Sequence, residues 1–63
     1  MDKYYGYLTI SKLNIAIKAL TEAQQYAADA RAPEWILFNL RKMSHGIQNR
    51  IDNILTLREM EKD

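Results

Sequence analysis

The chain has 63 residues, no cysteine, a single histidine and a formal charge of +1. A chain this short buries too small a fraction of its surface to be comfortably stable alone, and it can form neither a disulfide nor a thiolate metal site. We therefore expect one domain, without metal or cofactor, that forms a homo-oligomer in which neighbouring copies complete the core.

The charge balance and the hydropathy argue against two further classes of function. With nine basic and eight acidic side chains, the chain does not have the large positive net charge of proteins that bind DNA through counterion release. The longest uninterrupted apolar run, Trp35 to Phe38, is far shorter than a membrane span, and no basic start leads into an apolar signal segment. The sequence predicts no membrane partner, no strong DNA binding and a cytoplasmic location.

The N-terminal part of the chain predicts an arm followed by a helix. Residues 1–8 are rich in tyrosine, and Gly6 permits a bend. From about residue 9 to residue 30 apolar side chains recur at helical steps, and Thr9 or Ser11 is suited to cap the start. The predicted stripe of this first helix is Ile10, Leu13, Ile17, Leu20 and Ala27.

Pro33 separates this helix from a second one, predicted from about residue 33 to residue 60, because proline disfavours helical geometry before it and suits a first helical turn. In the second helix apolar residues alternate steps of four and three: Ile36, Leu40, Met43, Ile47, Ile54 and Leu57. We expect Trp35, Phe38, Ile51 and Leu55 to widen this stripe. At about 1.5 Å per residue the second helix would measure roughly 40 Å, against roughly 30 Å for the first.

The short connection makes the two helices antiparallel neighbours. A single hairpin cannot cover so broad an apolar band, whereas stacked hairpins can. The predicted fold is therefore all-α: an antiparallel two-helix hairpin with an N-terminal arm, assembling into an oligomeric helical bundle.

Arg50 falls on the predicted stripe of the second helix, and Gly46 lies in the middle of the same helix. A guanidinium on an apolar seam is costly unless it is neutralised. Arg50 would pair with an acidic residue of a neighbouring chain, reach water from the seam edge, or meet other copies of itself around an anionic ligand. Gly46 costs about 1 kcal/mol relative to alanine in a helix, so we expect either close approach of another helix or ligand, or a tolerant solvated position.

Tyr4, Tyr5 and Lys18 are the other candidate ligand-binding residues. Aromatic rings stack well on planar bases, and a nearby lysine can meet phosphate. The alternative interpretation is that the tyrosines form an apolar clasp at the end of the oligomer and that Lys18 is solvated surface. As a sequence signal, rings with nearby cations have low specificity.

A catalytic function is not expected. Ser11, Ser44 and His45 provide no ordered set of nucleophile, base and orienting acid, and the adjacent Ser44 and His45 point in different directions on a helix. Two glycines in the whole chain cannot supply a phosphate-binding loop or a dinucleotide fingerprint. We therefore predict a protein that is not an enzyme.

Two segments, "LNIAIKAL" and "PEWILFNLRKMSHGIQNRIDNI", resemble the helical-hairpin family of small bacteriophage proteins that sequester the cyclic nucleotide signals of bacterial defence, the anti-CBASS and anti-Thoeris sponges. The shared features are an Ile-Lys pair in the first helix, a tryptophan early in the second, a mid-helix glycine and an arginine four residues beyond it. In this chain they are Ile17 with Lys18, Trp35, Gly46 and Arg50.

This resemblance implies a hexamer of interlocked hairpins in the cytoplasm of a bacterial host, binding cyclic di- or trinucleotides between subunits without cleaving them. It places base stacking on Tyr4 or Tyr5, phosphate binding on Lys18, and a second ligand site on Arg50. In this chain either Tyr4 or Tyr5 can take the position of the family's tyrosine, and the loop around "DARAP" is shorter than the resemblance leads us to expect. The alternative is a small helical adaptor that binds a protein or an RNA through Lys12, Lys18, Arg41, Lys42 and Arg50.

Overall fold

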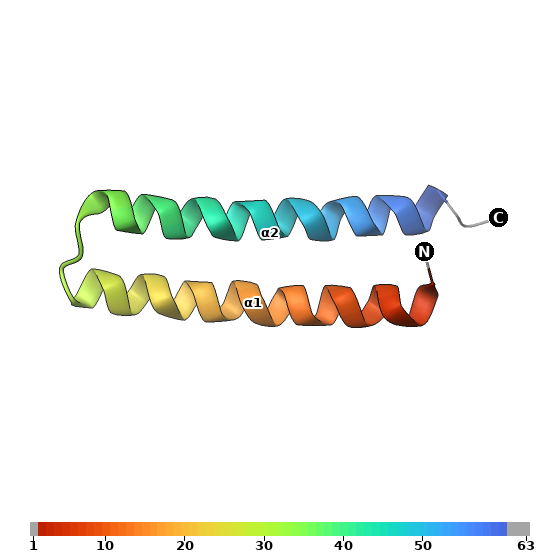
Figure 1. Ribbon diagram of the computed structural model, residues 1–63, viewed down its shortest axis with the longest axis horizontal. Coiled ribbons are helices and arrows are strands. Elements are labelled where there is room, and N and C mark those ends of the chain that lie inside the picture. The colour runs from red at the N-terminus through yellow and green to blue at the C-terminus, as the bar shows by residue number, and fades with distance from the viewer. Residues whose placement is uncertain (1, 61–63) are drawn as a thin grey trace.

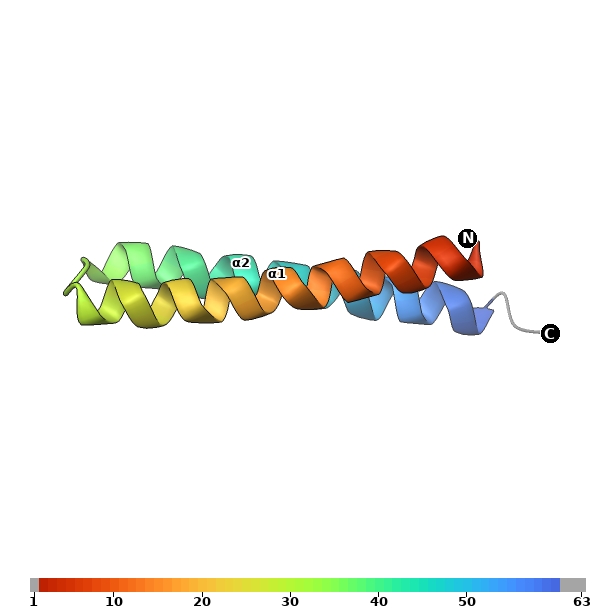
Figure 2. The same ribbon diagram turned by 90° about the horizontal axis from the view of Figure 1, so that it is seen from below.

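The computed structural model describes residues 2–60 and consists of two α-helices joined by a short connection (Figure 1). Helix α1 spans Lys3–Asp29 and helix α2 spans Glu34–Met60, each with 27 residues. The helices run antiparallel and cross at a shallow angle, giving a flat rod of 50 × 16 × 10 Å (Figures 1 and 2). The predicted all-helical hairpin is confirmed, whereas the predicted difference in helix length is wrong.

The predicted N-terminal arm is part of α1. Asp2 caps the helix: its Oδ1 accepts hydrogen bonds from the backbone N–H groups of Tyr4 at 2.9 Å and Tyr5 at 3.1 Å. Thr9, one of the two expected caps, lies inside the helix and donates its hydroxyl to the Tyr5 carbonyl at 2.7 Å. Gly6 does not bend the chain, because an aspartate cap starts the helix four residues before it.

The connection closes α1 with a left-handed residue. Arg31 has a φ of 59°. The Ala32 N–H donates to the Ala27 carbonyl at 2.9 Å and the Arg31 N–H to the Ala28 carbonyl at 3.0 Å, which together make a Schellman motif. The Pro33 carbonyl then accepts the Ile36 N–H at 3.0 Å, so the proline lies directly before α2. This tight connection holds the helices side by side.

The two helices meet along one regular stripe, which we call the seam. Every seam residue is buried or half-buried, and on each helix the residues alternate steps of three and four. On α1 the seam is Gly6, Ile10, Leu13, Ile17, Leu20, Gln24 and Ala27, and on α2 it is Leu37, Leu40, Ser44, Ile47, Ile51, Ile54 and Arg58. Gln24 Nε2 donates to Ser44 Oγ at 3.1 Å, a polar contact that ties the helices together.

The seam confirms the predicted stripe of α1 and corrects that of α2. Met43 and Leu57 were expected to face α1 but are 55% and 44% exposed, and the expected flanking residues Trp35 and Phe38 are 65% and 61% exposed. Ile51, which we expected at the margin, is 4% exposed. Leu40, Ile47 and Ile54 lie on the seam as predicted. The other positions of the stripe lie one residue later than predicted, so that Ser44 and Arg58 take the places expected for Met43 and Leu57.

The seam divides the remaining surface into two unlike faces. On antiparallel helices, residues that directly precede a seam residue lie on one side of the hairpin, and residues that directly follow one lie on the other. The first side, the alanine face, is centred on Ala16, Ala19, Ala23, Met43, Gly46, Arg50 and Leu57. The second side, the polar face, includes Asn14, Lys18, Thr21, His45, Gln48, Asp52 and Glu59.

Large apolar side chains remain exposed over much of the molecule. Of the hydrophobic side chains in residues 2–60, only Ile51 is buried. Neither helix, within the described residues, combines the length and the apolar character that a membrane crossing requires. The exposed apolar area is what a two-helix hairpin leaves when nothing covers its outer surfaces.

Candidate functional site

The tyrosines form an exposed aromatic cluster on the first turns of α1. The rings of Tyr4 and Tyr5 meet edge to face, with centroids 5.4 Å apart and planes at 73°. Tyr4, Tyr5 and Tyr7 are 65%, 67% and 61% exposed. Because the cluster is helical, the three rings leave the helix in different directions, and no single chain encloses a base between them.

Lys18 lies too far from the tyrosines to share a ligand with them in one chain. Tyr4 and Lys18 are separated by fourteen residues of continuous helix, which corresponds to about 21 Å along the axis. Lys18 is exposed and follows the seam residue Ile17, so it lies on the polar face, whereas Tyr5 precedes Gly6 on the alanine side. A pocket using both residues would have to combine two copies of the chain.

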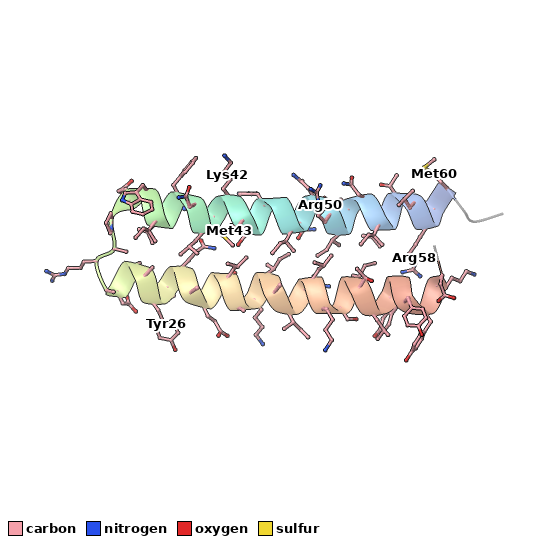
Figure 3. All side chains as sticks on the ribbon, in the orientation of Figure 1. Tyr26, Lys42, Met43, Arg50, Arg58 and Met60 are labelled. Carbon is pink, nitrogen blue, oxygen red and sulfur yellow. The ribbon has the colours of Figure 1, made fainter. Side chains whose placement is uncertain are left out.

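Arg50 is an exposed residue of the alanine face, and the expectation that it lies on the seam is wrong. The seam cation is Arg58, which is half-buried and directed toward the start of α1 (Figure 3). Opposite Arg58 the seam of α1 ends in Gly6, a buried residue without a side chain. At this end of the hairpin the methylene groups of Arg58 can pack on the seam while its guanidinium group reaches water. Arg50 does not take part in the seam, so its exposed side chain can contact a ligand or another copy of the chain.

Gly46 is an exposed residue in the middle of α2 and also belongs to the alanine face. A Cβ built at this position meets no other atom within 4 Å. Packing within the chain therefore does not require a glycine here. Of the two expectations, close approach by α1 is excluded, and what remains is a tolerant exposed position or close approach by another molecule.

A cationic and aromatic surface on α2 was not predicted as a unit. Phe38, Arg41, Lys42 and His45 line a shallow open depression of about 320 Å³. Lys42 points to the outer edge of the hairpin, away from α1 (Figure 3). The spacing of three, four and seven residues from Phe38 was visible in the sequence, but we had assigned Phe38 to the margin of the apolar stripe.

The residues considered for catalysis do not come together. The Ser44 hydroxyl lies on the seam and accepts the hydrogen bond from Gln24, whereas His45 is exposed on the polar face. Among the described residues, no three histidine or acidic side chains are clustered so that they would hold a metal ion. The arrangement offers binding surfaces made of rings and cations.

Comparison with known proteins finds no family model that matches the sequence, no similar curated protein and no similar solved structure. The resemblance to the cyclic nucleotide sponges therefore depends on the residues in the two helical segments.

Proposed function

We propose that this chain is a binding protein, not an enzyme, whose copies associate and hold a cyclic di- or trinucleotide second messenger at their interfaces without cleaving it. The observation that carries the proposal is the separation along α1 between Lys18 and the tyrosine cluster, which is about 21 Å for Tyr4 and about 17 Å for Tyr7. Both features are suited to a nucleotide, yet only an assembly of hairpins can bring a ring and a lysine to the same ligand.

Three features support this function. The exposed rings of Tyr4 and Tyr5 can stack on a base, Lys18 and Arg50 can neutralise phosphate, and both cations are exposed on the hairpin. Many copies of a rigid helical protein with such interfaces can lower the free concentration of a signal by mass action, because sequestration requires tight binding and no chemistry. The resemblance further implies that the assembly is a hexamer and that it acts in the cytoplasm of a bacterium infected by a phage.

Calorimetric titration with a panel of cyclic di- and trinucleotides tests this function. We expect at least one of them to bind, with no more than one ligand per chain, because each site takes a ring from one copy and a lysine from another. Lys18→Ala should weaken binding of the dinucleotide at least tenfold, and Lys42→Ala, which removes an exposed lysine at the outer edge of α2, is the matched control. Unchanged affinity in Lys18→Ala would contradict the assigned site.

The second candidate is an adaptor for a protein or an RNA, and the depression lined by Phe38, Arg41, Lys42 and His45 is the observation that favours it. The five basic residues first considered for an adaptor do not form a continuous stripe, because Lys42 lies on the outer edge and Arg50 lies on the alanine face. Binding of an RNA, with no binding of any cyclic nucleotide, would favour the adaptor.

A further inference from the structure

The alanine face is the surface of the hairpin that is built to receive another helical layer. Its α1 half presents Ala16, Ala19 and Ala23 at steps of three and four, and small side chains let a second helix approach closely. Its α2 half presents Met43 and Leu57, which are large, apolar and about half exposed. A row of small residues beside a row of large ones can interlock with a second copy of itself.

The polar face provides the contrast that identifies the alanine face. In the middle of the hairpin the residue that precedes a seam residue is smaller or more apolar than the one that follows it. Around Leu20 they are Ala19 and Thr21, and around Ser44 they are Met43 and His45. Toward the ends the contrast is lost, because Leu55 and Phe38 follow seam residues and Lys12 precedes one. The middle of the alanine face therefore matches a surface that is covered, and the middle of the polar face matches one that meets water.

The size of the alanine face fits a second copy of the chain. The two longer dimensions of the hairpin, 50 Å and 16 Å, enclose an area of about 800 Å². This is about the area that each partner contributes to a stable protein interface. The polar face has the same dimensions, so the composition of the middle of the hairpin, and not the area, distinguishes the two faces.

The stability of the chain also requires such a partner. One buried hydrophobic side chain among the described residues is far too small a core for a domain of 63 residues. Pairing through the alanine face would turn two layers of two helices into a four-helix bundle, the smallest common architecture that encloses a core between helices. Gly46, which nothing within its own chain requires, would then lie where another helix approaches.

We propose that two copies of this chain pair through their alanine faces to form a four-helix bundle, with Arg50 of each copy at the interface. The proposal rests on the self-association in the proposed function and specifies the face that carries it. A pair related by twofold symmetry presents the same patch twice. The interface therefore receives two Arg50 side chains, and none of the residues on which the alanine face is centred is acidic and could neutralise them.

Two matched pairs of substitutions test this proposal by light scattering. Ala19→Glu and Met43→Glu place a carboxylate on the alanine face, and Thr21→Glu and His45→Glu place the same group on the polar face beside the same seam residues. All four positions are exposed, so the two members of each pair differ in the face that they occupy. We expect the alanine-face variants to fall toward the monomer mass of 7.4 kDa and the polar-face variants to keep the mass of the wild type.

An alanine-face variant could also lose association because it unfolds, so cysteine labelling provides a second test of the face. The chain has no cysteine, so Ala19→Cys and Thr21→Cys each carry a single thiol. In concentrated solution Ala19→Cys should react with a maleimide at least tenfold more slowly than Thr21→Cys, and the difference should disappear on dilution. A wild type that is monomeric would overturn both this proposal and the self-association in the proposed function. An oligomer with equally reactive thiols, or one dissociated by the polar-face variants, would overturn the assigned face alone.

Discussion

The place of Ile51 on the seam predicts how far Ile51→Ala lowers the free energy of unfolding. Ile51 is 4% exposed, and truncation removes three carbons from the closed part of the seam. At about 0.8 kcal/mol per buried carbon the transfer term is about 2.4 kcal/mol, and an unfilled cavity raises the cost to about 3 kcal/mol. Leu55→Ala removes the same number of carbons from a side chain that is 45% exposed, so it should cost about 1 kcal/mol.

Urea denaturation followed by far-UV circular dichroism measures both free energies of unfolding. The protein concentration must be the same for every variant, because association contributes to the apparent stability. A difference of about 2 kcal/mol between the two variants corresponds to roughly 30-fold in the ratio of folded to unfolded chains. Equal losses for Ile51→Ala and Leu55→Ala, or a larger loss for Leu55→Ala, would refute the assigned register.

Four other substitutions probe local features of the hairpin and its interface. Arg31→Gly should raise the free energy of unfolding by about 1 kcal/mol, because glycine adopts the left-handed conformation of this residue without strain; a loss of stability would contradict the Schellman motif. Asp2→Ala should cost about 1 kcal/mol by removing the cap of α1, and Asp2→Asn should restore most of it. Gly46→Ala should weaken association, because the added methyl group lies where the second copy approaches, even though it meets no atom of its own chain and alanine favours the helix by about 1 kcal/mol. Arg50→Met should tighten dimerisation and weaken its dependence on sodium chloride, whereas the wild-type dimer should tighten as salt screens its two guanidinium groups; sedimentation at low and high salt measures both effects.

The sequence was sufficient to predict the hairpin, since the proline, the short connection and the stripe of α1 all depend on local rules. Where α1 begins was not predicted, because Gly6 and the tyrosines suggested an arm. The Asp2 carboxylate forms the cap, and Gly6 is buried at the end of the seam, so the helix tolerates the glycine. A capping aspartate just before the tyrosines was the available signal.

The register of α2 could not be chosen from apolar periodicity alone. Two stripes that share Leu40, Ile47 and Ile54 and differ by one residue at the other positions carry similar numbers of apolar residues. The one we favoured avoided Ser44 but included Arg50. The structure favours the other stripe because Ser44 finds a partner in Gln24 across the seam and Arg58 lies at the open end, where its side chain reaches water. Both compensations involve the opposite helix or its end, which a pattern along one helix cannot reveal.

The candidate ligand-binding residues were chosen for the chemistry of their side chains, but whether they lie near one another depends on how copies of the chain assemble. Sequence spacing suggested that the tyrosines and Lys18 were neighbours at one end of the hairpin. Extending α1 back to Lys3 places them about 17 to 21 Å apart, because every added helical residue contributes about 1.5 Å. When a site forms between copies, its residues need no particular separation in the sequence of one chain, so their spacing cannot reveal the site.

Sedimentation equilibrium of the wild-type protein between about 1 and 100 μM tests the central claim most directly, because association depends on protein concentration. The hairpin is expected to be incomplete alone, so the helical species should have a mass at least twice the chain mass of 7.4 kDa. Helical signal and association should be lost together on dilution. A stable, fully helical species of 7.4 kDa across this range would contradict the account.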